Sequence, residues 1–408
     1  MPVGTIEMSY QRVVITGLGA VTSVGLGAAS FCDALRKGTS GISEIEGFDT
    51  TGFHITRAGE VKGFDPDRWI RELNPSALGR SSQFAVAAAR MAIEDAAIDP
   101  EVLSHSECGV TIGTTEGESQ LEFRLVQQWV SDGPASLDAS LVTQTPADRL
   151  SVSVAREFYL HGEAMTLSTA CAAGNYAIGH AYDLIKTGET DFMLCGGVDS
   201  LSRSALAGFY RVGAIAPEIC QPFDANRQGI LTGEGAGLLF LESLASAERR
   251  GTRIYAEILG YGTNCDAQHM TAPDPSSIAG CMRLAHSNAG ISALDIDYIC
   301  AHGTGTPLND AVEAEAIREV FGNQPPPTSA IKSMIGHTMG AASALGSIAC
   351  ALALHRGFMP PTINIQTPDP KCGLDCVPNE ARTAELSIVQ NDGFAFGGNN
   401  AITIFGRR

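Results

Sequence analysis

The sequence predicts an α/β protein in which helices cover both faces of layered sheets. Short apolar runs, each closed by Gly, Ser or Thr, alternate with Ala-rich helical stretches along most of the chain. These runs show little of the polar alternation that half-exposed strands have, so we expect helices to bury both of their faces. Buried strands that alternate with helices are typical of layered α/β folds. The runs lie at 12–23, 108–117, 164–174, 191–200, 298–306 and 329–337.

Two strand-to-helix segments resemble each other and indicate a repeat. The strand before Cys171 leads into a helix rich in Gly and Ala at 172–188, and the strand before His337 leads into a similar helix at 338–357. We therefore expect two related halves, 1–255 and 256–408, with the functional residues between them. Because α/β patterns resemble one another, this similarity alone leaves a duplication open.

Length and charge restrict the function. The chain has 408 residues, 44% of them hydrophobic, enough for a large core without disulfides or metals. Twenty-seven Lys and Arg against 45 Asp and Glu give a formal charge of -18. A general surface for nucleic acid or anionic lipid is therefore not expected.

The termini and the cysteines indicate the cellular compartment of the protein. No apolar stretch reaches the roughly 20 residues that span a bilayer, and no basic region precedes the first apolar stretch as in a secretory signal. Eleven cysteines, an odd number, argue against a disulfide framework. We expect a reduced, cytoplasmic protein that has neither a membrane nor nucleic acid as a partner.

Cys171 is the first candidate for chemistry. It lies where a strand turns into a helix, so free backbone N–H groups and the positive helix end face its sulfur. This setting is expected to lower the pKa of the thiol and to favour the nucleophilic thiolate. Most buried cysteines are small core residues instead. The cysteines in apolar or helical contexts fit that description: Cys32, Cys195, Cys281, Cys300 and Cys350.

Two histidines accompany this cysteine. His302 and His337 both follow predicted strands, in turns rich in glycine and hydroxyl groups. A lone loop histidine is more often a solvated residue, but two in matching contexts with one activated cysteine suit nucleophilic thiol chemistry. Lys332, Asp310 and Glu313 lie close to them in sequence and are expected to fix the loops as ion pairs, which is compatible with tuning the histidines.

The glycine-rich segment 391–401 is the third element. Gly393, Gly397 and Gly398 give its backbone freedom, and Phe394 and Phe396 give it apolar bulk. One interpretation is a hairpin that packs two core aromatics. The other is a mobile loop beside a tunnel, with a Phe as gate and a backbone N–H as oxyanion donor. Spacing alone leaves both open.

Metal and nucleotide motifs do not match. Cys372 and Cys376 have no second thiol or histidine pair at zinc spacing, and no HExxH occurs. The segment 16–25 departs from a dinucleotide loop at its third glycine, and GEGAG at 233–237 lacks the Lys-Ser/Thr of a P-loop. We expect no metal and no cofactor of the protein's own.

Together, the motifs resemble the β-ketoacyl-[acyl-carrier-protein] synthases, the condensing enzymes of fatty acid and polyketide synthesis. The resemblance implies a five-layered αβαβα thiolase-like fold with two related halves, and a dimer across one central sheet. Eight blocks match in order over nearly the whole chain: VVITGLGAVTSVG, STACAAGNYAIG, QPFDANRQGILTGEGAG, GYGTNCDAQHMTAP, AHGTGTPLNDAVEAEAI, IKSMIGHTMGAASA, PPTINIQTPDP and FAFGGNNA.

The resemblance also implies a reaction and its residues. Cys171 would accept an acyl chain from a carrier-protein phosphopantetheine, and malonyl carrier protein would lose carbon dioxide and attack that thioester, giving a β-ketoacyl carrier protein. His302 and His337 would support decarboxylation and stabilise the enolate. The N–H groups of Cys171 and Phe396 would form an oxyanion hole. The other implied residues are Lys332 and Glu313 for the histidine network, Thr304 and Thr306 for the pantetheine arm, Phe396 as gate, and Phe394, Gly397 and Gly398 beside the substrate.

Several positions depart from the family pattern. Ala395 stands in place of the first glycine of the gating loop and should stiffen it; Gln228 and Ser343 are further departures. Glu116 stands where fatty acid enzymes have an apolar residue that lines the acyl pocket at the dimer seam. A buried carboxylate needs a partner, so we expect a shorter or more polar pocket, or one that a partner subunit closes.

The expected partners are an acyl carrier protein and a second subunit, in a homodimer or in a heterodimer with a ketosynthase-like chain-length factor. Of the basic docking surface of the family, Lys62, Arg68, Arg71 and Arg80 remain, and the first three are the candidates for docking. Besides a polyketide ketosynthase, the alternatives are a fatty acid elongating enzyme, a non-catalytic chain-length-factor-like subunit, a degradative thiolase and a cysteine hydrolase. The intact cysteine and histidines argue against the non-catalytic subunit, and the C-terminal loop lacks the second cysteine of a thiolase.

Overall fold

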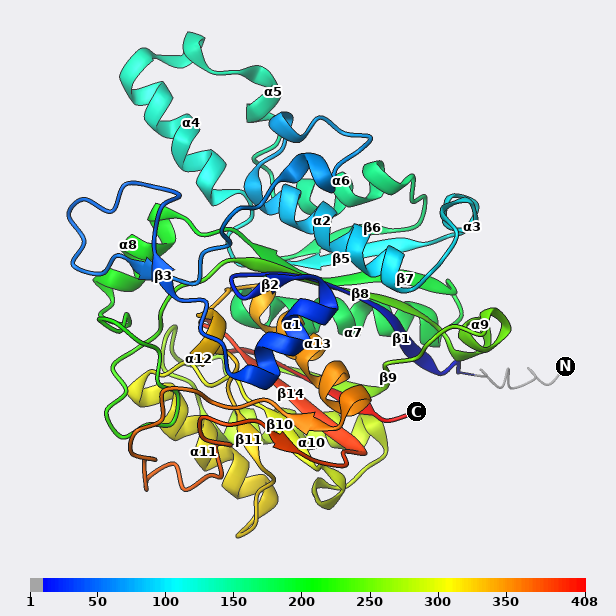
Figure 1. Ribbon diagram of the computed structural model, residues 1–408, viewed down its shortest axis with the longest axis vertical. Coiled ribbons are helices and arrows are strands. Elements are labelled where there is room, and N and C mark those ends of the chain that lie inside the picture. The colour runs from blue at the N-terminus through cyan, green and yellow to red at the C-terminus, as the bar shows by residue number, and fades with distance from the viewer. Residues whose placement is uncertain (1–9) are drawn as a thin grey trace, which may run out of the picture.

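The computed structural model describes residues 10–408 (Figure 1). The first nine residues of the predicted N-terminal half, which open the segment considered for a signal, lie outside the described residues. Among residues 10–408, eleven strands form one mixed sheet, in which β2 (Gly25–Leu26) pairs only with β1. Its strands in spatial order are β11 (Thr328–Ser329), β10 (Tyr298–Cys300), β14 (Ile388–Phe394), β15 (Asn399–Gly406), β9 (Ala256–Cys265), β1 (Val13–Thr22), β8 (Gly235–Ser243), β7 (Phe192–Asp199), β5 (Gly109–Gly113) and β6 (Ala164–Leu167).

The same strand order occurs twice in this sheet. From the centre outward, β1-β8-β7-β5-β6 on one side corresponds to β9-β15-β14-β10-β11 on the other. In both series the outer three strands are parallel and the inner pairings are antiparallel. Only Val13–Ile15 of β1 pair with β9, so the two series meet along a short seam. The repeated order agrees with two related halves, while the boundary at residue 255 stays a prediction.

The helices complete five layers (Figure 1). On one outer face lie α2 (Arg80–Asp95) and α6 (Arg149–Phe158); on the other lie α10 (Pro275–Ala289) and α11 (Pro307–Phe321). Between the two halves of the sheet lie α7 (Ala173–Lys186) and α13 (Ala341–Arg356), beside α1 (Gly27–Lys37). This arrangement confirms the predicted α/β layering.

Small residues bring the two central helices close together. Every residue from Ala341 to Leu354 of α13 is buried, as expected of a helix surrounded by protein on all sides. A Cβ added to Gly174 of α7 would lie 2.6 Å from the Ala344 backbone nitrogen. Glycine is therefore required where the helix after Cys171 crosses α13, and this crossing sets how deeply both helix starts are buried.

Shorter elements surround the layers. They are β3 (Ser43–Glu44), β4 (Arg57–Ala58), α3 (Pro100–Ser104), α4 (Ser119–Asp132), α5 (Ala139–Val142), α8 (Arg203–Arg211), α9 (Leu244–Arg250), α12 (Lys332–Ile335), β12 (Phe358–Met359) and β13 (Arg382–Thr383). In Figure 1, α4 and α5 project beyond the layered body. Over residues 10–408, no helix has the length and apolar character to cross a membrane.

Candidate active site

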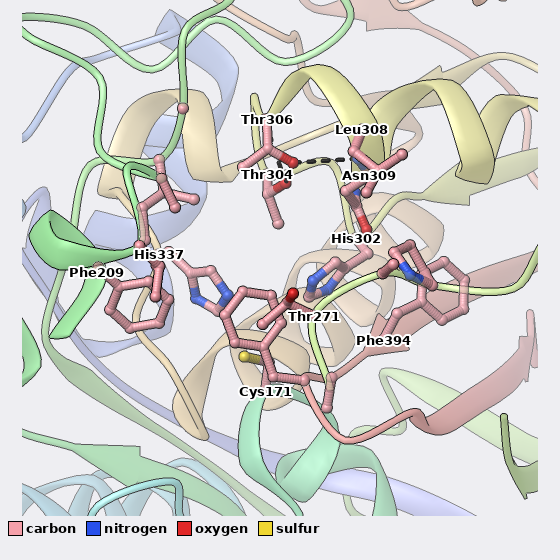
Figure 2. Close-up of a pocket in the computed structure, with 18 of the residues that line it drawn as sticks. Cys171, Phe209, Thr271, His302, Thr304, Thr306, Leu308, Asn309, His337 and Phe394 are labelled. Carbon is pink, nitrogen blue, oxygen red and sulfur yellow. Dashed lines mark hydrogen bonds between the residues drawn. The ribbon is translucent and has the colours of Figure 1, made fainter. Parts of the chain in front are cut away.

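One cavity of about 330 Å³ joins the predicted functional residues. Cys171, His302 and His337 all line it, and their side chains converge in Figure 2 although they come from three separate loops. The rings of His302 and His337 lie with their centroids 5.6 Å apart, almost perpendicular to one another. The volume lies in the range of small-molecule sites.

Cys171 lies in a one-turn 3-10 helix, Ala170–Ala172, between β6 and α7. Ala170 has a φ of 49°, a left-handed conformation that turns the chain sharply and aims the thiol into the cavity. Burial raises the pKa of the Cys171 thiol to about 11, although the Lys332 ammonium and the N–H groups of Phe396 and Cys171 lower it. The predicted lowering of this pKa is therefore wrong, because desolvation outweighs the helix start.

His302 follows β10 and is held from two sides. Nζ of Lys332 donates to the carbonyl oxygen of His302 and lies 3.4 Å from Nδ1 of its ring. Carboxylate oxygens of Glu313 accept from the N–H groups of His302 and Gly303, at 2.7 and 2.8 Å. Because Nδ1 faces an ammonium donor, it accepts, and the ring proton belongs on Nε2.

His337 reaches the same protonation state by another contact. The N–H of Met339 donates to Nδ1 of His337 at 3.1 Å, which leaves Nε2 to carry the proton. Burial and the Lys332 charge lower the pKa values of His302 and His337 well below their usual range. Both rings are therefore neutral and each can donate one Nε2–H hydrogen bond into the cavity.

Lys332 and Glu313 are both buried, and their pKa values are shifted in opposite directions. Burial lowers the pKa of Lys332 and raises that of Glu313 to about 7. Their charges favour each other, which opposes both effects. Among residues 10–408, Lys332 and Glu313 do not form the expected ion pair within 4 Å; each contacts the main chain of the His302 segment instead, while Asp310 lies 3.6 Å from Arg227.

The turn after His302 is held by Asp310. Its carboxylate accepts from the N–H groups of Thr304 and Gly305, both at 3.1 Å. Thr306 caps α11 by accepting from the N–H of Asn309 at 3.2 Å, and its hydroxyl lies 3.1 Å from that of Thr304 (Figure 2). Thr304 and Thr306 both line the cavity, so this turn places two hydroxyl groups on its wall.

Comparison with known proteins decides the family. The model of the β-ketoacyl synthase N-terminal domain matches residues 10–247, and that of the C-terminal domain matches residues 255–366. This chain belongs to the β-ketoacyl synthase family. The 3-oxoacyl-[acyl-carrier-protein] synthase 2 of Staphylococcus aureus is 36% identical over 405 residues, 97% of this chain and 98% of the relative. The enzyme of the same name from Coxiella burnetii is 36% identical over 411 residues, 98% of this chain and 99% of the relative.

Solved structures extend this assignment. The ishigamide ketosynthase/chain length factor is 51% identical with a TM-score of 0.96, over 98% of this chain and all of that one. A type II polyketide ketosynthase, bound to its acyl-carrier protein and a hexaketide, is 31% identical with a TM-score of 0.90 over the same shares. A β-ketoacyl synthase from Burkholderia phymatum is 35% identical, also with a TM-score of 0.90 and the same coverage. The thiolase-like fold and the class of carbon–carbon bond-forming acyltransferase are thereby confirmed.

In this β-ketoacyl synthase, the two phenylalanines of the glycine-rich loop lie in different surroundings. Phe394 is buried, with its ring centroid 5.6 Å from that of His302. Phe396 is 41% exposed at the cavity mouth, with its ring 5.8 Å from that of Phe209 on α8. The packing interpretation therefore describes Phe394, while the gating role of Phe396 stays a prediction.

The turn that carries Phe396 needs both of its glycines. Gly397 and Gly398 have φ values of 87° and 84°, which only glycine adopts readily. A Cβ on Gly398 would also lie 2.8 Å from that of Asp266. Hydrogen bonds from Ala395 to the carbonyl of Asn399 and from Gly397 to that of Met270, at 3.0 and 2.8 Å, close the turn.

Glu116 lies apart from this cavity. Its carboxylate accepts from the hydroxyls of Ser119 and Ser202 at 2.8 and 2.9 Å, so it has the polar partners that the sequence left open. It is partly exposed at the base of α4 and does not line the cavity around Cys171. Its contribution to an acyl pocket stays a prediction.

The three predicted docking cations differ in their freedom to bind a partner. Lys62 pairs with Glu60 and, at 3.1 Å, with Glu46. Arg71 lies 3.3 Å from Glu94. Arg68 has no carboxylate within 4 Å among residues 10–408, and its guanidinium lies 5.9 Å from the Trp69 ring. Two of the three charges are therefore already partly neutralised.

One buried carboxylate at the site was missed. Asp199, at the end of β7, accepts from the N–H groups of Thr115 and Gly340 at 2.8 and 2.6 Å and from the Thr114 hydroxyl at 2.7 Å. It thus joins the loop before Glu116 to the start of α13. Burial raises its pKa to about 6. A lone Asp after a strand gives no sequence signal for this role.

Proposed function

We propose that this β-ketoacyl synthase catalyses decarboxylative Claisen condensation between an acyl group on Cys171 and malonyl acyl carrier protein. One observation carries the proposal: two pairs of donors surround one thiol. The N–H groups of Cys171 and Phe396 lie near enough to the sulfur to lower its pKa, and the Nε2–H groups of His302 and His337 face the same cavity. Two reactions that each build negative charge on an oxygen need two such pairs.

In the first reaction, Cys171 takes the acyl group. Its sulfur attacks the thioester carbonyl of the acyl carrier, and the carbonyl oxygen becomes an oxyanion between the N–H groups of Cys171 and Phe396. The carbon–sulfur bond to phosphopantetheine then breaks. The proton lost by the Cys171 thiol, whose pKa is about 11, goes to the departing pantetheine thiol. Thiol is exchanged for thiol, and no net charge is left in the buried site.

In the second reaction, malonyl carrier protein loses carbon dioxide. The electron pair of the breaking C–C bond forms an enolate, whose oxygen accepts from Nε2–H of His302 and of His337. Burial keeps both rings neutral, so they remain donors whose other nitrogens are already occupied. Lys332 holds His302 and adds positive charge beside the enolate.

Condensation then joins the two groups. The enolate carbon attacks the Cys171 thioester, and the carbonyl oxygen again lies between the two N–H donors. The carbon–sulfur bond breaks, the Cys171 thiolate leaves, and a proton from solvent restores the thiol. The product is a β-ketoacyl carrier protein. The phosphopantetheine arm belongs to the substrate, and side chains and backbone groups of this chain perform every step.

The proposed pathway is polyketide synthesis in the cytoplasm, with a ketosynthase-like chain-length factor as partner subunit. Identity supports it: 51% to a ketosynthase/chain length factor against 36% to the fatty acid relatives. Strand β6 ends the sheet with partly exposed residues and offers an edge for a second subunit. Glu116 would make the acyl pocket at that seam more polar, and Arg68, Lys62 and Arg71 would contact the acidic carrier protein.

Intact-mass spectrometry tests the reaction. Purified protein, with and without its ketosynthase-like partner, is incubated with acyl carrier proteins and then with malonyl carrier protein. We expect an acyl adduct that is absent in Cys171→Ala, and a β-ketoacyl carrier product. No adduct with any carrier, with or without the partner, would refute the proposed function. If C14–C16 saturated acyl groups load best, the polar pocket and the polyketide role are wrong and fatty acid elongation is favoured.

A further inference from the structure

A polar cluster lies buried where α7, α13 and the β14–β15 hairpin meet. Asn175, Ser343, Ser347, Asn391 and Thr403 are each at most 3% exposed. None of them lines the cavity, so the proposed reaction does not use them directly. Buried polar groups cost stability unless they are paired, and a fully paired cluster fixes the elements around it.

The carboxamide of Asn175 is the centre of this cluster. Its Nδ2 donates to the carbonyl of Asn391 in β14 at 3.2 Å and to that of Ala401 in β15 at 2.9 Å. One side chain on α7 therefore holds both strands of the hairpin. Its Oδ1 accepts from Nδ2 of Asn391 at 2.8 Å and from the Ser347 hydroxyl at 3.1 Å, so the amide is satisfied on both sides.

The position of this contact links it to the site. Asn175 lies about one helical turn after Cys171. The hairpin that it holds ends in the turn that carries Phe396, and the bond from Ala395 to Asn399 continues the hairpin into that turn. The N–H of Cys171 lies in the 3-10 turn that leads into α7, and the N–H of Phe396 lies in the turn that closes the hairpin, so each donor adjoins one of the elements that Asn175 joins.

We propose that Asn175 is a positioning residue, whose paired hydrogen bonds to β14 and β15 set the separation between the N–H of Cys171 and the N–H of Phe396. This inference rests on the proposed function, in which those two groups bind the oxyanion during acyl transfer. A displacement of about 1 Å between catalytic groups can cost roughly a hundredfold in rate. Only a side chain with two N–H groups on one atom can bind both carbonyls from this position.

The contacts of Asn175 should matter for only one of the two reactions of the enzyme. The histidine donors follow β10 and α12 and are held by Lys332, Glu313 and Met339, none of which contacts Asn175 through a hydrogen bond. Loss of the Asn175 carboxamide should therefore affect acyl transfer to Cys171 and leave the decarboxylation of malonyl carrier protein nearly intact. A residue that only stabilised the fold would affect both reactions to the same extent.

Asn175→Ala tests this with two measurements. The first is alkylation of Cys171 by iodoacetamide at pH 8, followed by peptide mapping, with the rate in the wild-type protein as the reference. Because the Phe396 N–H lowers the Cys171 pKa, its displacement should slow alkylation of Cys171 at least threefold relative to wild type. The second compares half-reactions: acyl transfer should fall by about tenfold to a hundredfold, and malonyl decarboxylation by less than threefold.

Matched variants keep the test decisive. Thr16→Val in β1 removes another fully buried hydrogen bond, the one to Glu242 of β8 at 2.7 Å, and should change neither measurement. If Asn175→Ala does not fold, Asn391→Ala replaces it, because it keeps the main-chain carbonyl but removes the bond to Oδ1; a smaller change in the same direction is expected. Unchanged alkylation of Cys171, or an equal loss of both half-reactions, would overturn the inference. Alkylation needs no carrier protein, so it reports on Asn175 even if the proposed condensation fails.

Discussion

In the N-terminal half, β6 ends at Leu167 and the chain turns through Cys171 into α7. In the C-terminal half, β11 ends at Ser329 and passes through α12 and His337 into α13. The two junctions hold equivalent places in the repeated strand order. Burial acts on their side chains in opposite directions, since it raises the pKa of the Cys171 thiol and lowers that of the His337 imidazole.

The starts of the two helices also differ. The N–H of Gly340, at the start of α13, donates to the buried carboxylate of Asp199 at 2.6 Å, so an acidic group of the other half neutralises this helix end. At the start of α7 the N–H of Cys171 lies beside its own thiol instead. In the proposed reaction, the N–H of Cys171 binds an oxyanion, whereas the start of α13 is occupied by Asp199 and follows a histidine donor. On that proposal, acyl transfer belongs to the N-terminal junction and malonyl activation to the C-terminal one.

The largest expected effect is the loss of acyl transfer when the N-terminal junction is altered. Cys171→Ala removes the only thiol lining the cavity among residues 10–408, so no acyl adduct should form. Decarboxylation of malonyl carrier protein should continue, because both Nε2–H donors remain. Intact mass measures the adduct, and released carbon dioxide measures the other reaction. An adduct that persists would place the acyl group on another of the ten remaining cysteines. Acyl transfer would then not belong to the N-terminal junction.

Changes at the C-terminal junction should have the reverse effect. His302→Ala and His337→Ala each remove one donor to the enolate, so malonyl decarboxylation should fall by about a hundredfold to a thousandfold. Acyl loading of Cys171 should stay within about tenfold, since its N–H donors are untouched. Both rates are measured on the same preparations. An equal loss in loading would show that the histidines also serve the first reaction.

The layers and the three converging residues could be predicted because their signals are local. Each functional side chain follows a short apolar run and precedes a glycine-rich turn, and the chain order of such segments specifies the layers. The direction of the Cys171 pKa shift could not be predicted in the same way. It depends on burial by elements of both halves, and the helix start, the only feature visible in sequence, has the smaller effect.

Contacts between residues far apart in the chain also could not be predicted from the sequence. Lys62 was expected to be a free docking cation, yet Glu46 and Glu60 lie against it because β3 and β4 bring their loop back. Asp199 and Asn175 carry no motif of their own. Their partners, Gly340 and the β14–β15 hairpin, lie in the opposite half of the chain. Contacts of this kind follow only once the two halves are packed together.

The contact between Asp199 and the start of α13 should make the stability of the protein depend on pH. The Asp199 pKa is raised from 3.8 to about 6, so the folded protein holds this proton more tightly than the unfolded chain does. Its contribution to stability is full below pH 3.8 and is lost as pH rises through 6, by up to about 3 kcal/mol. Asp199→Asn lacks this titration, so its melting temperature relative to wild type should rise between pH 4.5 and 7. Calorimetry checks this, with the exposed Asp132→Asn as control. A constant difference would show that Asp199 is ionised throughout and binds α13 without cost.

The smallest expected effects concern the carrier surface, which lies outside both junctions. Arg68 has no carboxylate partner within 4 Å among residues 10–408, whereas Lys62 is held by Glu46 and Glu60. Exposed ion pairs contribute roughly 0.2–1 kcal/mol, so Arg68→Ala should raise KM for the acyl carrier protein by up to about fivefold. Lys62→Ala should change it by less than about twofold, because its charge already meets two acids. Steady-state kinetics at 50 and 300 mM salt separates the two residues. Salt weakens an ion pair between the enzyme and the carrier protein, so KM rises with salt only where such a pair exists. The reverse order would mean that the carrier displaces Glu46 and Glu60 from Lys62, and that the resting ion pairs of this face open on docking.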